Sequence, residues 1–150
     1  MRTIAIAACA LVVCACGAAP QPPTAGAPAG DSPLHGTWQL FELLAADNSF
    51  VRPSGPAKYT MTLTADGRAA FKLDCNKGSG GWKASAPKAG RGDFTFTPIA
   101  MTRAMCPEGS LDTRIAKELE DVRSYSIDGD RLTLVLAADA GSQIWTHAAP

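Results

Sequence analysis

The chain has 150 residues, of which 46% are hydrophobic and 19% charged, and its formal net charge is zero. This length allows one domain, and the balance of residue types is that of an ordinary globular protein. Without a net charge there is no bulk electrostatic reason to expect nucleic acid as a partner.

The first segment has the pattern of a secretory signal. Met1 and Arg2 give a short positive start, and the twelve residues 4–15 form an uncharged apolar run. Such a run is too short to span a bilayer, which needs about 20 residues, but it suits the apolar region of a signal peptide. We therefore expect residues 1–15 to be a cleaved signal outside the fold.

Residues 13–17, Val-Cys-Ala-Cys-Gly, resemble the lipobox of bacterial lipoproteins, in which cleavage exposes a cysteine that is then acylated. This pattern predicts lipidation at Cys16, and two or more acyl chains anchor a protein stably in a membrane. Gly17 stands where an inner-membrane retention signal has aspartate, so in a bacterium with two membranes we expect the outer membrane, facing the periplasm. The alternative is ordinary signal cleavage near Ala18 or Ala19, which would release a soluble protein.

A proline-rich stretch separates this signal from the rest of the chain. Residues 17–33 contain no aromatic side chain and no aliphatic side chain larger than alanine, apart from their prolines. The stretch cannot bury enough apolar surface to fold, and its prolines favour a semi-extended spacer. We thus divide the chain into a signal (residues 1–15), a lipidated cysteine with its tether (16–33) and one folded domain (34–150).

The domain opens with β patterns. Residues 59–64 alternate large apolar residues with threonine, which is the period of a half-buried strand. The alternation resumes after a turn marked by Asp66 and Gly67. A three-residue loop centred on Gly67 keeps one face apolar by pairing Leu63 with Phe71, so we expect a bulged hairpin with Gly67 in a left-handed conformation.

A second hairpin is indicated near the C-terminus, where Asp128 and Gly129 separate two apolar stretches. A two-residue turn there pairs Tyr125 with Leu132. Further strands are expected at residues 36–43, 94–97 and 143–146. In the first of these the apolar positions change face after Leu40, which predicts a bulge or burial on both faces.

One amphipathic helix is predicted ahead of the second hairpin. Leu111, Ile115, Leu119 and Val122 recur at helical spacing, and Ser110 is the expected N-cap. A helix with one apolar stripe needs an apolar surface to cover, and an antiparallel sheet supplies it. The predicted fold class is therefore α+β.

Five segments of the domain, taken together and in their order along the chain, form a recognisable pattern. They are residues 34–40 (Leu-His-Gly-Thr-Trp-Gln-Leu), 74–82 (Asp-Cys-Asn-Lys-Gly-Ser-Gly-Gly-Trp), 99–106 (Ile-Ala-Met-Thr-Arg-Ala-Met-Cys), the predicted helix, and 125–132. In this order they resemble the META domain, or HslJ-like, family of bacterial envelope proteins. The resemblance implies a curved, mostly antiparallel, half-barrel-like sheet crossed by one helix, and no known catalytic activity. Asp74 stands where the family usually has glycine, and aspartate is one of the few residues that tolerate a left-handed backbone.

Candidate catalytic or metal-binding residues are few. The only histidines, His35 and His147, do not have the spacing of metal ligands. The glycine run at residues 78–81 lacks the pattern of a phosphate-binding loop, and we expect it to connect two strands. Asp128 and Asp130 match part of a calcium loop, but the later ligand positions are missing and a hairpin turn explains them. We predict no catalytic residue, no cofactor and no metal.

Cys75 and Cys106 are the only cysteines that remain in the domain after signal cleavage. An even pair in an oxidising compartment is more often a bridge than a pair of free thiols. We predict a disulfide between them, with Cα atoms about 4.4–6.8 Å apart. The alternative is a reactive cysteine working with a histidine.

Charge is unevenly placed along the chain. Residues 68–103 contain seven basic and two acidic residues, whereas residues 108–130 contain seven acidic and three basic ones. This indicates either two solvated faces or one side suited to an anionic envelope partner, such as lipopolysaccharide or an acidic protein.

We expect a non-enzymatic lipoprotein, held to the membrane through Cys16, with a binding or stress-tolerance role. The alternative is a small inhibitor of an envelope-attacking enzyme such as lysozyme.

Overall fold

The computed structural model describes residues 32–55 and 58–148, so the predicted signal, Cys16 and nearly all of the tether lie outside the described residues. The strands are β1 (Gly36–Ala45), β2 (Phe50–Val51), β3 (Tyr59–Leu63), β4 (Arg68–Leu73), β5 (Asn76–Ala84), β6 (Arg91–Phe96), β7 (Ala100–Met101), β8 (Val122–Asp128), β9 (Arg131–Leu136) and β10 (Gly141–His147). The helix α1 spans Asp112–Glu120, and one 3₁₀ turn, η2, spans Ala137–Asp139. No described helix has the length and apolar character needed to cross a membrane.

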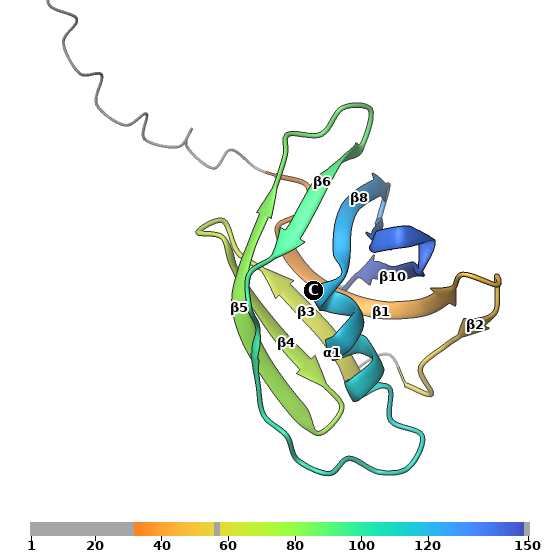
Figure 1. Cartoon of the computed structure of the whole chain (residues 1–150). Coiled ribbons are helices and arrows are strands. Elements are labelled where there is room, and N and C mark those ends of the chain that lie inside the picture. Colours follow the sequence, from red (N-terminus) through yellow and green to blue (C-terminus); the bar gives the residue numbers. More distant parts are fainter. Residues whose placement is uncertain (1–31, 56–57, 149–150) are drawn as a thin grey trace, which may run out of the picture.

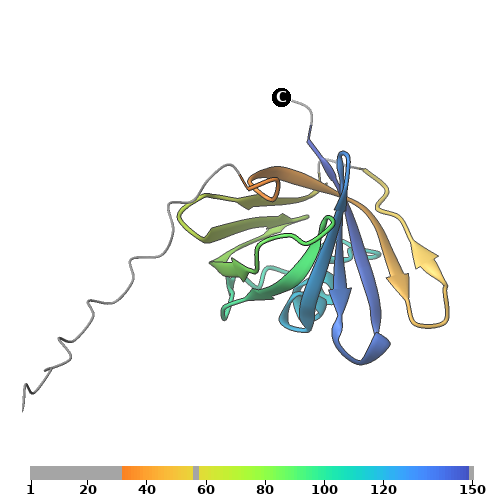
Figure 2. The same ribbon diagram turned by 90° about the horizontal axis from the view of Figure 1, so that it is seen from above.

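The strands form one antiparallel sheet that curves round on itself (Figures 1 and 2). Its order is β10-β9-β8-β6-β5-β4-β3-β1, and β10 pairs again with β1, so eight strands close into a barrel. The predicted half-barrel is therefore wrong in this respect. The predicted irregularity after Leu40 is present as a register shift between Leu40 and Glu42, and the bulge bends β1 so that it can pair with both β3 and β10.

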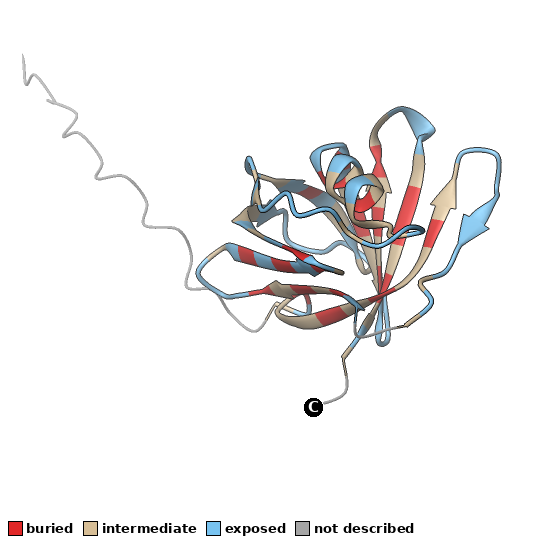
Figure 3. Ribbon diagram, turned by 90° about the horizontal axis from the view of Figure 1, so that it is seen from below, coloured by how far each residue is buried: buried red, intermediate tan, exposed pale blue. Residues whose placement is uncertain are grey.

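The barrel interior is filled by large side chains. Trp38, Phe94, Tyr125 and Trp145 are all essentially inaccessible to solvent. Figure 3 shows the buried residues alternating along the strands, as expected when one face of each strand points inward. The space inside the barrel is thus a packed core, and any binding site has to lie at its rim or on its outside.

The helix lies across one end of the barrel (Figure 1) and turns Ile115 and Leu119 into the core. It begins at Asp112 with Leu111 as N-cap, one residue after the predicted Ser110, although the Ser110 hydroxyl still accepts a hydrogen bond from the Asp112 N–H at 3.4 Å. The Leu111 side chain packs against the core and its backbone N–H donates to the Tyr59 hydroxyl at 2.9 Å. These contacts fix the start of the helix one residue later than the capping pattern suggests.

The β3–β4 hairpin has the predicted loop length and the predicted left-handed Gly67, with φ of 79°. Its register differs by two residues, because Leu63 lies opposite Ala69 and not Phe71. The loop is centred on Asp66, whose carboxylate accepts a hydrogen bond from the Thr64 hydroxyl, and Gly67 is its last residue. A shift of two residues leaves the apolar face unchanged.

The β8–β9 hairpin shows the same kind of difference. Tyr125 lies opposite Leu134, and the two-residue turn consists of Gly129 and the residue after it. Gly129 has a φ of 57°, so the glycine occupies the first loop position, where a positive φ is needed. Asp128 then becomes the last paired residue and lies opposite Arg131.

The glycine run at residues 78–81 lies inside β5 and is not the expected loop. A Cβ atom at Gly78 would come within 2.7 Å of the Met101 side chain, and one at Gly80 within 3.1 Å of Ile99. The glycines therefore let residues 99–101 lie directly on the strand. Asp74, just before β5, has a φ of 56°, which agrees with its position in place of a family glycine.

Candidate binding groove

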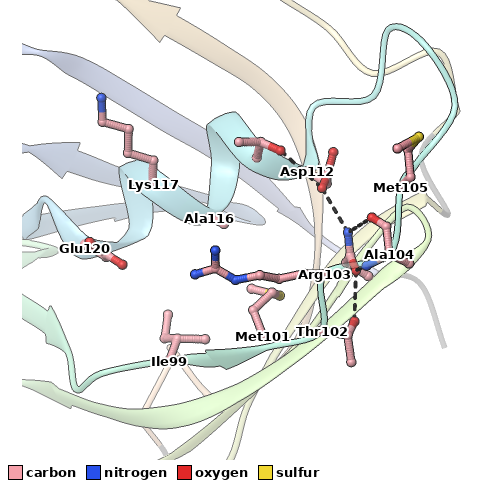
Figure 4. A pocket seen from close by; sticks show the side chains of 12 residues that line it. Ile99, Met101, Thr102, Arg103, Ala104, Met105, Asp112, Ala116, Lys117 and Glu120 are labelled. Atoms are coloured by element: carbon pink, nitrogen blue, oxygen red, sulfur yellow. Dashed lines mark hydrogen bonds between the residues drawn. The ribbon is translucent and has the colours of Figure 1, made fainter.

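A groove runs between residues 99–105 and the helix α1, with a volume of about 550 Å³ (Figure 4). It exists because the two-residue β7 lies outside the closed circuit of eight strands and, among the described strands, pairs only with β5. On the side of β5 that carries β6 and β7, β6 pairs onward with β8, whereas β7 has no further strand partner among the described residues. The chain continues from β7 into a loop and then into α1, which covers the open end but leaves the groove beside β7.

The floor of the groove is apolar. Ile99, Met101 and Ala116 are partly buried and pack against the hydrophobic core. Asp112, Ala116 and Glu120 recur every four residues and so share one face of the helix, the face turned toward β7 in Figure 4. Because Ala116 at the centre of this face is small, the helix leaves room above Met101.

Two cationic residues line the groove, and only Arg103 points into it, because the Lys117 amine is directed away from β7 in Figure 4. Arg103 points its guanidinium group over the floor between Met101 and the helix, and Lys117 lies on the adjoining helix surface (Figure 4). Within the described residues neither side chain forms a hydrogen bond or an ion pair. Glu120 lines the end nearest Ile99, so the groove carries charges of both signs.

Asn76 holds the opposite end of the groove in place. This residue is only 3% exposed. Its carboxamide oxygen accepts hydrogen bonds from the Thr102 hydroxyl at 2.9 Å and the Ala104 backbone N–H at 2.8 Å. Its nitrogen donates to the Ala104 carbonyl at 3.1 Å and to the Asp112 carboxylate at 3.0 Å. One buried amide therefore joins β5, the loop after β7 and the start of the helix.

The predicted disulfide is present beside this amide. Cys75 and Cys106 are bonded, and their Cα atoms lie 5.5 Å apart, inside the expected range. Met105, which precedes Cys106 in the chain, projects into solvent and is 99% exposed. The two cysteines were identified from the sequence but Asn76 was missed, although an asparagine directly after Cys75 at the start of a strand was a usable signal.

The other residues singled out from the sequence lie away from the groove. His35 packs on the edge of Trp82 and His147 on the edge of Trp38, with ring centroids 5.8 and 4.9 Å apart. Asp128 belongs to a hairpin turn, and no group of three potential metal ligands occurs in residues 32–55 and 58–148.

The basic residues of segment 68–103 separate into three places. Arg68, Lys72, Lys77 and Lys83 lie on the outer face of β4 and β5, where Lys72 is directly opposite Lys77. Lys88 and Arg91 face each other at the β5–β6 hairpin. Only Arg103 reaches the groove. The outer face of β4 and β5 thus carries four of the seven basic residues of the segment, of which Arg68 is paired with Asp66.

The fold is thus a small closed β-barrel with one helix across its end and a groove beside that helix. Residues 32–148 match the family model of the META domain, and the chain therefore belongs to the META domain family. No curated protein sequence gives a significant match.

Two solved structures have a similar fold. The NMR structure of a protein from Burkholderia xenovorans superposes with a TM-score of 0.63 at 18% identity, covering 89% of this chain and 97% of that one. The crystal structure of a DUF4847 family protein from Bacteroides vulgatus gives a TM-score of 0.54 at 17% identity, covering 78% and 95%. At these identities the likeness concerns the fold alone.

Proposed function

We propose that this META domain protein is a non-enzymatic, lipid-anchored protein of the cell envelope that binds a partner in the groove between β7 and α1. The observation that carries the proposal is the groove itself, which combines an apolar floor with the Arg103 guanidinium group, a cation that has no described partner. Concave, mostly apolar surfaces with a few convergent polar groups are typical binding sites.

The contacts of the reactive residue types favour binding over catalysis. Both histidines pack against tryptophan rings outside the groove. The Asp112 carboxylate accepts a hydrogen bond from Asn76, and Cys75 and Cys106 are bonded to each other. A general acid or base needs a titratable group within reach of the bound molecule. These groups are engaged in structural contacts, and of the acidic groups in the groove only Glu120 has no described partner.

The proposed anchor places the groove near the membrane. A proline-rich chain extends by about 3.1 Å per residue, so residues 16–33 would let the domain move up to about 50 Å from a lipidated Cys16. In an outer membrane this range lies within the periplasm. The cationic outer face of β4 and β5 would suit an anionic membrane or polysaccharide surface within that reach.

One experiment can test the anchor and the groove independently. Cells producing the wild type, Cys16→Ala or Ala116→Leu would be cross-linked with formaldehyde and fractionated. The wild type should be found in membranes with a discrete cross-linked product. Cys16→Ala should move the protein to the soluble fraction or leave it uncleaved. Ala116→Leu narrows the groove at the centre of its helix wall. It should reduce the product at least about fivefold without changing the fraction, because the larger side chain occupies the space above Met101.

Ala65→Leu, which changes an exposed alanine in the β3–β4 loop, is the matched control and should behave as the wild type. An unchanged product in Ala116→Leu would contradict binding in the groove. Wild-type protein without acyl mass on Cys16 would contradict the anchor.

A further inference from the structure

We infer that the ligand of this groove is an extended peptide segment with a carboxylate, which adds as a strand to the free edge of β7. The inference rests on the proposed function, because it names the chemical class that the proposed groove would bind. Three features of the molecule support it: the backbone of β7, the charges and apolar surface of the groove, and the groove's length.

The edge of β7 that faces the groove has unused backbone groups. The Thr102 N–H donates to the Lys77 carbonyl at 2.9 Å, and Met101 lies opposite Gly78 in the same register. Hydrogen-bonded and non-bonded pairs alternate along an antiparallel ladder, so the N–H and C=O of Met101 point away from β5. No other described strand pairs with β7. An exposed strand edge of this kind is a template for an added strand.

The side chains around this edge complement a peptide with a negative charge. Arg103 provides a cation over the floor without a described partner. Asp112 is hydrogen-bonded to Asn76 and Glu120 lines the end nearest Ile99, so Arg103 is the position at which a carboxylate would bind. Guanidinium and carboxylate groups match in geometry and form strong charge-assisted hydrogen bonds. Ile99 and Met101 would pack against the side chains that an added strand turns inward.

The dimensions suit a short segment. The helix that forms the opposite wall has nine residues and is about 13 Å long at 1.5 Å per residue. A strand rises about 3.3 Å per residue, so the groove holds about four extended residues. The groove volume of about 550 Å³ is consistent with a segment of this size.

A single-chain anionic amphiphile is the alternative occupant, since it could use Arg103 and the apolar floor. It could not use the backbone edge of Met101, because an alkyl chain neither donates nor accepts hydrogen bonds. The backbone edge therefore favours the peptide and also gives a test that separates the two.

The test uses the full chain without its predicted signal, residues 16–150, with Cys16→Ala, so that the protein carries no lipid and can be handled without detergent. A library of displayed random heptapeptides would be selected against it, and the selected sequences synthesised as fluorescent peptides for affinity measurement. We expect peptides with an acidic side chain or a free carboxyl end. Arg103→Gln and Ala116→Leu should each weaken binding at least about tenfold, which corresponds to about 1.4 kcal/mol.

Backbone methylation supplies the decisive comparison. Methylating the peptide N–H groups that face β7 should weaken binding at least about tenfold, while methylating the alternate, outward N–H groups should leave it within about twofold. Peptides with amidated ends distinguish a free terminus from an acidic side chain as the source of the carboxylate. The Arg103→Gln variant keeps this test informative even if Ala116→Leu impairs folding, because Arg103 is exposed.

Three results would overturn the inference. The first is that no selected peptide loses affinity in Arg103→Gln. The second is that methylation of the peptide backbone changes the affinity at no position. The third is that no peptide binds, whereas decanoate, a single-chain anionic amphiphile, binds and loses affinity in Arg103→Gln and Ala116→Leu. If the cross-linked product in cells still requires an open groove, such a result removes the peptide and leaves the proposed binding function intact.

Discussion

Removing the disulfide by Cys75→Ser together with Cys106→Ser should lower the free energy of unfolding by about 3–4 kcal/mol. The bridge joins residues separated by 31 positions, and the chain-entropy model gives about this value for a loop of that length. A small domain has a total stability of roughly 5–15 kcal/mol, so the loss is a large share. Urea denaturation followed by tryptophan fluorescence measures it.

The reduced wild type is the matched control for this double variant and should have the same denaturation midpoint. A loss below about 1 kcal/mol would contradict the prediction. Labelling of two free thiols in the folded, non-reduced wild type would also contradict it and would reopen the case for a reactive cysteine.

Asn76→Ala should destabilise the domain by about 3–4 kcal/mol. The substitution removes five hydrogen bonds of a nearly inaccessible side chain and leaves the N–H and C=O of Ala104 without their partner. Each hydrogen bond contributes about 0.5–1.5 kcal/mol to stability, and five are lost together. Because these bonds join β5 to both walls of the groove, the variant should also lose binding in the groove.

Thr102→Ala provides a graded comparison, because it removes the hydroxyl that donates to Asn76 and accepts from the Lys77 N–H, and keeps the other four bonds of the amide. We expect it to cost about 1 kcal/mol in the same denaturation experiment. If Asn76→Ala were no more destabilising than Thr102→Ala, the amide would not be the junction that its contacts suggest.

The alternation of apolar residues predicted most strands and the helix, because the side-chain period depends only on local geometry. Register was predicted less well. In both hairpins the pairing differs by two residues, since the turn is set by where the positive φ falls. In one loop the glycine takes the last position, Gly67, and in the other the first, Gly129. A shift of two residues leaves the same side chains facing the core, so the core residues were still identified.

Closure of the barrel could not be predicted from local patterns. It depends on pairing between β1 and β10, the first and last strands of the described domain, and on the bend at the bulge after Leu40. The bulge was predicted from the change of apolar face, but the strand to which it leads depends on the curvature of the whole sheet. A local pattern contains no information about that curvature.

The candidate site was predicted only in part. Cys75 and Cys106 could be paired by counting cysteines in an exported domain. Arg103 was noted only as one of seven basic residues, because nothing in the sequence shows that it leaves the others and enters a groove. The free edge of β7 could not be predicted either, because whether a strand edge is paired depends on which other strands the whole fold brings beside it.

Amide hydrogen exchange at residues 101–104 of the mature full-length chain with Cys16→Ala tests most directly the central claim that β7 presents an unpaired edge to the groove. The Thr102 N–H donates to Lys77 and the Ala104 N–H to Asn76, whereas the Met101 N–H faces the groove. We predict that Met101 exchanges at least about tenfold faster than Thr102 and Ala104, because exposed and unpaired amides are the least protected. Equal protection of Met101 and Thr102 would show that the edge is already paired and would contradict the claim.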